Sequence, residues 1–380
     1  MTQSNRSRRR SAIGLQIAFT FLLAGVGYIA LHSLASNMTS QGIRTGFGFL
    51  WEPSTVASVT TVASGLDTAP TYAASILEGA ANTLLAAVLV IVATTIIGVV
   101  AGVVQNSRLW LLAKMFQLYI GVTRNIPALV HVLFWYAAFR NLPAVRQAFQ
   151  PVPGIILSNR GVWIPSPAHS AEAALFVAIA VVVSIGSAVL LGARLPTGIK
   201  LQAIYRRAIY LIVGIVAAGT VLAVVPWQLP HRQGLSYVGG ASISIELTSL
   251  FIALALYHGS YIAEIVRAAI DSIPVAQREA AASLGLHRPH ITWLIVIPQA
   301  IRVIMPQLPN EYIGALKGTA LAVAIGFHDI STITATIVNN TGQAVEPMVI
   351  LALFYLLASG GLSSLVNGFN EFKLRKGLRR

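Results

Sequence analysis

The sequence predicts an all-α polytopic membrane protein with about eight transmembrane helices. Hydrophobic residues make up 56% of its 380 residues and charged residues only 10%, whereas soluble domains keep about a quarter of their residues charged. Long windows of the chain hold no charged residue, and a bilayer core about 30 Å thick needs about 20 apolar helical residues. Water is therefore not the main solvent of this chain.

Eight windows are candidates for spans. Six are free of charge, and the sixth of the eight, 247–263, is short but continues helically through Glu264 to Arg267. The other two are interrupted, one by Arg124 and one by Glu311 and Lys317. In chain order, the windows are 11–43, 79–107, 115–139, 173–193, 208–231, 247–263, 306–327 and 347–370.

The ends and loops of these windows carry further signals. Residues 12–31 form an apolar stretch too long for a signal peptide, so we expect an uncleaved anchor. Gly98 and Gly102 form a GxxxG pair that would let another helix approach closely. Segments 141–167 and 226–240 are rich in proline and glycine, and we expect simple loops there and in 32–77.

The basic residues predict the orientation. With eight spans, nineteen of the 26 lysines and arginines fall on the side of the N-terminus, five fall opposite, and Arg124 and Lys317 fall inside spans. Cytoplasmic loops carry the excess of basic residues. Both termini are therefore expected in the cytoplasm. The net charge of +14 follows from the same excess and indicates no nucleic-acid partner.

The most informative segment is 264–286, which this topology places in the cytoplasm. Pro274 suits the first position of a helix and Gly285 suits a left-handed C-terminal cap, which leaves about ten residues, or about 15 Å. That helix is too short and too polar to span. From its physics alone, it is either a connector between two spans or a small-residue surface for another protein.

The spacing around this helix resembles a known motif. Glu279-Ala280-Ala281, three residues, Gly285, nine residues and Ile295-Val296-Ile297-Pro298 resemble the EAA motif of ABC importer permeases. The departure is Ile297, where the motif has leucine.

The resemblance extends to the polar amino acid permeases of the histidine, glutamine and general L-amino acid uptake systems, and covers about 79–139 and 243–369. It implies a type I permease core of five helices with three extra helices, and three regions: an anchor and periplasmic segment, 1–78; a permease domain, 79–370, with helices inserted at about 172–231; and a basic cytoplasmic tail, 371–380. The similar stretches are 79–84 (GAANTL), 124–127 (RNIP), 298–302 (PQAIR) and 316–321 (LKGTAL).

In that family the EAA loop docks on a separate ATPase. The resemblance therefore implies an inner-membrane subunit for amino-acid import that works with an ABC ATPase pair, a second permease in a heterodimer, and a periplasmic amino-acid-binding protein. No lysine follows a glycine, so the chain has no GK[ST] of a P-loop. We expect ATP and magnesium in the partner ATPase, no cofactor here, and no enzymatic activity in this chain.

Charged residues inside spans mark a candidate translocation path. A charge at the centre of a membrane helix costs about 2.5–3.5 kcal/mol and usually faces a cavity or a partner. The alternative is that Arg124 and Arg267 reach the membrane interface while Glu264 and Arg267 form a local pair. The candidates are Arg124, Asn125, Pro127, Glu264, Arg267, Glu311 and Lys317.

Two other functions remain open. A secondary transporter or channel would show inverted repeats and need no ATPase, and no repeat is visible. A membrane enzyme would need a catalytic cluster, and none is found at suitable spacing. The eight histidines form no HExxH or similar metal-ligand spacing, and the chain has no cysteine.

Overall fold

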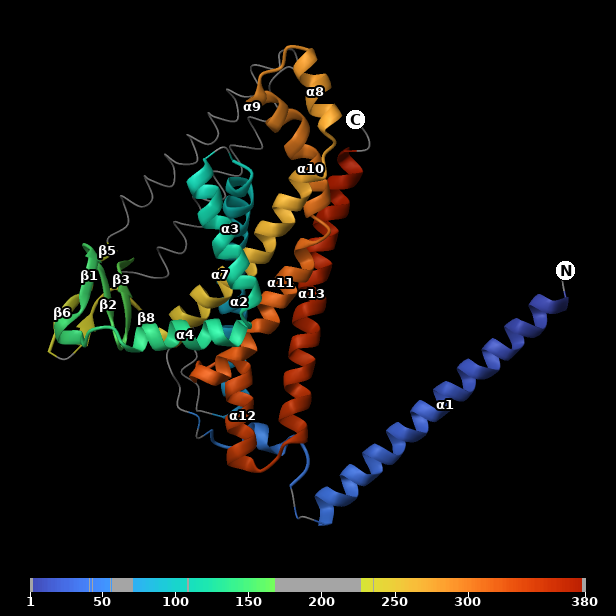
Figure 1. Cartoon of the computed structure of the whole chain (residues 1–380). Helices are drawn as coiled ribbons and strands as arrows, with labels where there is room; N and C mark the ends of the chain where they lie inside the picture. The colour runs from blue at the N-terminus through green and yellow to red at the C-terminus, as the bar shows by residue number, and fades with distance from the viewer. Residues whose placement is uncertain are drawn as a thin grey trace, which may run out of the picture. The chain divides into compact units, whose positions relative to one another are not determined.

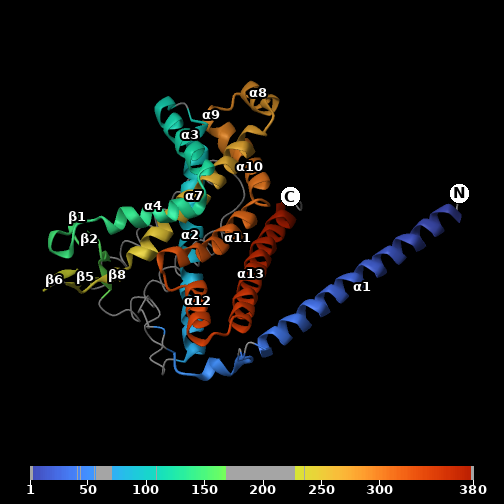
Figure 2. The same cartoon turned by 60° about the horizontal axis from the view of Figure 1, so that its bottom comes forward.

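A computed structural model describes residues 3–40, 42, 44–54, 56, 71–107, 109–167, 227–234 and 236–377. These residues form mainly helices and a small group of antiparallel strands (Figures 1 and 2). The chain divides into two compact units, Ala86–Phe327 on the one hand and Met1–Leu85 with His328–Arg380 on the other. The long helix α2 (Tyr72–Gln105) contributes its first part to the second of these and the rest to the first.

The central helix of the Ala86–Phe327 unit is α7 (Ile245–Asp271), which is about 40 Å long at 1.5 Å per residue. Ser244 caps its N-terminus by accepting a hydrogen bond from the Leu247 N–H at 3.2 Å. The other helices of the unit are α3 (Trp110–Asn125), α4 (Ala128–Arg140), α8 (Val275–Ser283), α9 (Arg288–Ile291), the π-helix η3 (Thr292–Val296), α10 (Ile297–Ile304), α11 (Leu308–Gly318) and the 3₁₀ segments η2 (Val145–Gln147) and η4 (Thr319–Ile325).

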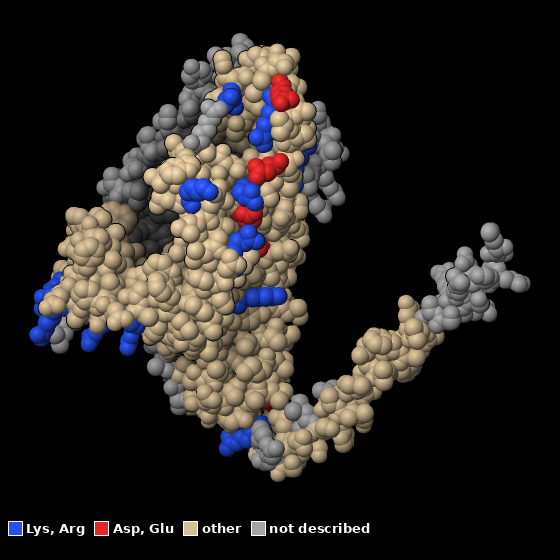
Figure 3. Space-filling view, viewed as in Figure 1, with Lys and Arg blue, Asp and Glu red and all other residues tan. Residues whose placement is uncertain are grey.

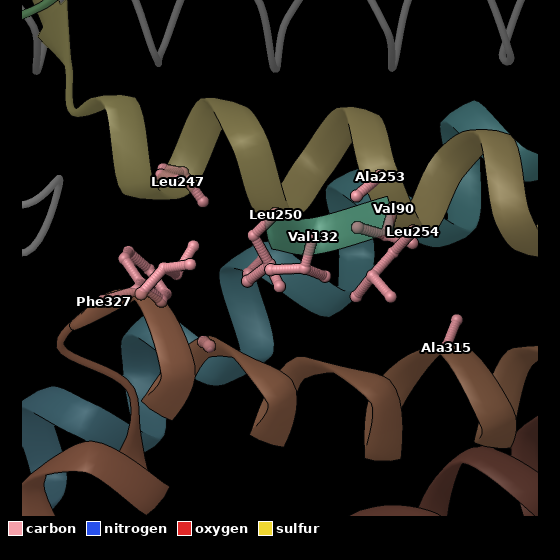
Figure 4. Close-up of a cluster of buried hydrophobic side chains, with 11 residues drawn as sticks. Val90, Val132, Leu247, Leu250, Ala253, Leu254, Ala315 and Phe327 are labelled. Atoms are coloured by element: carbon pink, nitrogen blue, oxygen red, sulfur yellow. The ribbon is translucent and has the colours of Figure 1, made fainter. Parts of the chain in front are cut away.

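Apolar side chains of four segments meet along α7 (Figure 4). Leu250 and Leu254 of α7 are fully buried against Val132 of α4, Val90 of α2 and Ala315 of α11. Between membrane helices, such side chains stabilise the contact by close van der Waals packing rather than by removal from water. This cluster fixes α4 and α11 on α7.

The GxxxG pair of α2 lies against α7, as the sequence indicates. A Cβ at Gly98 would sit 2.5 Å from the Ile262 side chain, and one at Gly102 would sit 2.6 Å from the Ala263 carbonyl oxygen. The two backbones are thus close enough that only glycine fits at these turns.

A small set of strands precedes α7 and corrects the expectation of simple loops at 141–167 and 226–240. One sheet has the order β1-β2-β3-β8 and is antiparallel throughout; two short ladders pair β4 with β5 and β6 with β7. Val145, Ile156 and Trp163 form its core. The strands are β1 (Phe149–Val152), β2 (Ile155–Ser158), β3 (Gly161–Ile164), β4 (Ser166–Pro167), β5 (Trp227–Gln228), β6 (His231–Gln233), β7 (Ser236–Val238) and β8 (Ala241–Ile243).

The other unit is held together around the start of α12. Thr83 of α2 accepts a hydrogen bond from the Ile330 N–H at 3.1 Å, and Asn82 donates to the His328 carbonyl at 2.9 Å. Phe49, in the segment 32–77 expected as a loop, is buried beside Tyr72. The unit contains α1 (Gln3–Ser40), η1 (Phe47–Trp51), the first part of α2, α12 (Ile330–Thr341) and α13 (Val345–Gly377).

Among the described residues, three helices are long and apolar enough to cross a membrane: α2, α7 and Val345–Gly368 of α13. A fourth span results if two bent segments are counted as a single span: Arg288–Ile304 and Leu308–Ile325, which meet at an angle of 51°. The expected span 115–139 is wrong as a single helix, because it breaks between α3 and α4. Windows 173–193 and 208–226 lie outside the described residues, and 227–231 is partly strand. The expected count of eight thus remains a prediction.

Candidate functional site

The short helix α8 follows α7 after a sharp turn. Its residues are Val275–Ser283, with Pro274 as the N-cap and Gly285 beyond the end at φ +77. The Gly285 N–H donates to the Ala282 carbonyl at 2.9 Å and the Leu286 N–H to the Ala281 carbonyl at 3.2 Å. These two bonds are the Schellman motif, in which glycine takes the left-handed position. The predicted short helix between two stops is therefore confirmed, except that Pro274 lies at the N-cap, one position before the first helical residue.

The inner side of α8 is bound to its own chain. Ala281 is buried with Ile273, Ile291 and Val296, and Ile295 packs against this cluster. At the two ends of the contact, polar groups add hydrogen bonds. Gln299 donates to the Gln277 side-chain oxygen at 2.6 Å, and Arg278 donates to the Ile270 carbonyl at 2.6 Å.

The outer side of α8 is exposed and is not covered by other described residues of this chain. Glu279 and Ala280 are exposed, and so is Leu284, at 83%. A Cβ at Gly285 would meet nothing within 4 Å. The residues 279–298 singled out from the sequence thus divide into two sets: Ala281, Gly285, Ile295 and Pro298 build the loop, Pro298 in the first turn of α10, while Glu279 and Ala280 face outward.

A series of charged side chains follows the second half of α7 (Figure 3). Glu264 accepts hydrogen bonds from Arg267 one turn away and lies 3.9 Å from Arg124 of α3. Arg267 also reaches Asp271 at 3.3 Å, and Asp271 accepts from Asn106 of α2 at 3.1 Å. The local Glu264–Arg267 pair is therefore present, and Arg124 joins it from a second helix.

Arg124, Asn125 and Pro127 also mark the break between α3 and α4. Ile126 is extended (φ −105, ψ 131) and Pro127 is the N-cap of α4, because proline disfavours helical backbone before it and lacks an N–H. Asn125 donates to the Gly121 carbonyl at 2.7 Å. Asn125 and Pro127 thus end one helix and begin another, and only Arg124 of the three contacts α7 through its charge.

The two charged residues of α11 differ in their partners, since Glu311 contacts α7 and Lys317 is exposed. Glu311 lies 3.1 Å from Nδ1 of His258, a nearly buried residue of α7. Gly314 leaves room for that imidazole, since a Cβ there would sit 3.0 Å from its Cε1 atom. Lys317 is exposed and makes no ion pair with the described residues.

Aromatic side chains connect these two polar groups along α7. The Arg124 guanidinium lies 5.1 Å from the Tyr261 ring centre, and the hydroxyls of Tyr261 and Tyr257 are 3.2 Å apart. Tyr257 in turn packs against His258 and against His131 of α4. The sequence alone assigns no role to these tyrosines, although their spacing of four residues places them on one face of the helix.

Residues 94–376 match the family model described as the binding-protein-dependent transport system inner membrane component. The chain belongs to this family. It is 36% identical over 370 residues to the general L-amino acid transport system permease protein AapQ of Rhizobium johnstonii, covering 94% of this chain and 91% of AapQ. It is 30% identical over 413 residues to the glutamate/glutamine/aspartate/asparagine transport system permease protein BztB of Rhodobacter capsulatus, covering 96% of this chain and 93% of BztB.

The family match and these relatives confirm the resemblance to amino-acid ABC transporter permeases, which the sequence indicates by the motif at 279–298 together with the stretches 79–84, 124–127, 298–302 and 316–321. The match includes α7, α8 and the charged series. No group of three or more histidine, aspartate or glutamate side chains that could hold a metal occurs among the residues the structure describes.

Proposed function

We propose that this chain is the translocation subunit of an ATP-driven importer of amino acids, and that α8 receives the motion of a separate ATPase. The observation that carries the proposal is the division of α8 into a bound inner side and an open outer side. The small side chain of Ala280 would let a partner surface approach closely. The extensive similarity to AapQ favours general L-amino acids as the substrates.

The proposed assembly has four kinds of partner: a pair of ABC ATPases that bind ATP and magnesium, a second permease that forms a heterodimer with this chain, an extracytoplasmic amino-acid-binding protein, and the bilayer of the inner membrane. The chain itself performs no chemistry. Both termini and α8 lie in the cytoplasm in this arrangement, because that side carries nineteen basic residues against five.

We further propose that the polar face of α7 borders the translocation path. Four of the charged residues on this face have an ionic or hydrogen-bonding partner: Arg124, Glu264, Arg267 and Glu311. Such partners support the presence of charged side chains at membrane depth. Lys317 is exposed without one among the described residues, so its ammonium needs water, a partner subunit or a substrate carboxylate. A role at the path or at a subunit contact accounts for this exposure.

The test of coupling uses Gly285. Valine at φ +77 is strained, whereas asparagine tolerates that region. We expect Gly285→Val to lower ATP-dependent amino-acid uptake by more than about tenfold in proteoliposomes containing the assembled transporter, and Gly285→Asn to retain most of it. Full uptake by a correctly inserted Gly285→Val protein would contradict the coupling role.

A second variant separates docking from loop geometry. Ala280→Trp adds bulk on the exposed side of α8 and touches none of the buried cluster around Ala281. We expect it to prevent the ATPase pair from co-purifying with the permease. Its matched control is Gly121→Trp on α3, an exposed position with nothing within 4 Å of its Cβ. Equal ATPase recovery with both variants would argue against docking at α8.

A further inference from the structure

The strands before α7 carry an unusual concentration of arginine. Five basic residues fall on the extracytoplasmic side in the predicted topology, and four of them belong to this segment. Residues 140–167 and 227–243 contain no aspartate or glutamate. We call these four residues the arginine patch: Arg140, Arg146, Arg160 and Arg232, all exposed.

The arginine patch lies on helix ends, turns and strands that share one apolar core. Its residues come from four separate places: the end of α4, η2, the turn between β2 and β3, and β6. The core of Val145, Ile156 and Trp163, with Tyr237 packed on the indole at 5.3 Å between ring centres, holds these pieces together. Figure 3 shows blue side chains over the strands and no red ones among them on that face.

The strands and α8 lie at opposite ends of α7. β8 ends at Ile243, one residue before the Ser244 cap of α7, whereas α8 follows the other end at Asp271. Both views of the structure agree on this separation (Figures 1 and 2). With α8 in the cytoplasm, the arginine patch faces the medium from which an importer takes its substrate.

The chemistry of the surface favours a protein partner. Strand β1 is exposed along its whole length, including Phe149 (56%) and Val152 (53%), at the sheet edge farthest from β8. Arginine and aromatic side chains are enriched in protein interfaces, and the guanidinium pairs with carboxylates in two parallel hydrogen bonds. A lipid surface with anionic headgroups attracts any basic residues near it and does not require them to be held in fixed positions. Here a core holds the arginines in place, and exposed apolar side chains lie on the same sheet, which favours a protein partner.

We propose that the arginine patch is a docking surface for an acidic face of the extracytoplasmic amino-acid-binding protein. This inference rests on the proposed importer function and names where one of its partners binds. The arginines steer the arrival of the partner, since complementary charge mainly raises the association rate. Phe149 and Val152 supply the apolar contact that remains after docking.

The experiment compares association rates with the assembled transporter in nanodiscs of zwitterionic lipid. The probe is the binding protein that supports uptake by the wild-type transporter, loaded with its amino acid. We expect the triple variant Arg146→Glu, Arg160→Glu, Arg232→Glu to slow association by about tenfold or more at low salt, and by less at high salt because ions screen exposed charges. Arg44→Glu is the matched control, because Arg44 is the remaining extracytoplasmic basic residue and lies outside the patch; it is expected to associate normally.

A cross-link locates the contact directly. Because the chain has no cysteine, Arg160→Cys accepts a photo-cross-linker at one site only. Cross-linked peptides rich in aspartate and glutamate from the binding protein would support the proposal.

One result would overturn it: the triple variant associates as fast as wild type at low salt. If that variant at the same time loses binding of phosphatidylglycerol vesicles, the patch is a lipid contact instead. A wild-type transporter that takes up no amino acid with any binding protein would overturn the importer function itself, and this inference with it.

Discussion

Gly79 of α2 and Ile330 of α12 touch through their backbones. A Cβ on Gly79 would lie 3.0 Å from both the N and Cα atoms of Ile330 and 2.7 Å from Cδ1 of Ile333. Together with Asn82 and Thr83, Gly79 forms a notch that receives the first turn of α12. The stretch 79–84, which resembles the opening of the permease domain in the family, thus has a packing role.

Gly79→Ala should destabilise the protein. The added methyl group cannot be absorbed by a flexible side chain alone, because backbone atoms of Ile330 are in its way. We expect a net loss of up to about 2 kcal/mol, because an overpacking cost of about 1–3 kcal/mol is offset by about 1 kcal/mol from the better helix propensity of alanine. Thermal unfolding in detergent measures the loss. Gly121→Ala, with open space around it, should leave stability equal or higher, and the reverse order would contradict the packing role.

Thr83→Val should remove the acceptor of the Ile330 N–H. Thr83 is fully buried, and its hydroxyl also donates to the Gly79 carbonyl at 2.8 Å. A buried N–H without a partner costs about 1–3 kcal/mol, so the denaturation midpoint of the variant should fall. Thr83→Ser keeps the hydroxyl and should lose less than half as much. Equal losses for valine and serine would mean that the methyl group, not the hydrogen bond, matters.

Asp329 should make stability depend on pH. It lies between η4 and α12, outside the candidate spans, and caps α12 by accepting from the Thr332 N–H at 2.8 Å. Burial raises the pKa of its carboxyl above the ordinary value, although hydrogen bonds from Thr332 and Ser331 offset part of the rise. The folded chain therefore holds this proton more tightly than the unfolded chain. The free energy of unfolding should fall as pH rises from about 3.9 through the raised pKa.

Asp329→Asn tests that slope. Asparagine keeps an oxygen for the Thr332 N–H but cannot ionise, so this part of the pH dependence should disappear from unfolding measured between pH 4 and 7. A slope unchanged in Asp329→Asn would show that another group causes it.

Double-mutant cycles should rank the two arginine partners of Glu264. Arg267 donates hydrogen bonds to both carboxylate oxygens, whereas Arg124 approaches only to 3.9 Å. All three side chains are more than a quarter exposed, so each coupling should be about 1 kcal/mol or less. We expect the Glu264–Arg267 coupling to be the larger, with both reduced at high salt. A larger Arg124 coupling would place the ion pair between helices rather than within α7.

The sequence predicted best where the signal is local. Gly285 and Pro274 define α8 because a left-handed cap and a fixed φ act on one or two residues. The break at Pro127 was missed, although the rule for residues before proline points to it, because hydrophobicity continues through 115–139. Helix α12 was also missed, although the sequence carries the usual signals for both of its ends. Asp329 is its N-cap and Gly342, at φ +70, is its C-cap.

Contacts between distant residues could not be predicted. His258 and Glu311 are 53 positions apart, and only the packing of α11 on α7 through Leu254 and Ala315 brings them together. The strands have two to four residues each, too few for an alternating pattern to stand out. Their pairing of β3 with β8 joins residues separated by about 80 positions, which a single sequence does not reveal.

The break at Ile126 has a consequence for the lipid around this protein. The break lies beside the part of α7 that holds Tyr257 and Tyr261, because His131 of α4 packs against Tyr257. At the break, the Thr123 carbonyl lies 3.2 Å from the His131 imidazole, in place of the N–H of a continuing helix. Acyl chains cannot satisfy the amide and carbonyl groups left at two helix ends. Where the break lies at the depth of the hydrocarbon core, these groups need other partners, so we expect protein or water rather than acyl chains against this flank of α3 and α4.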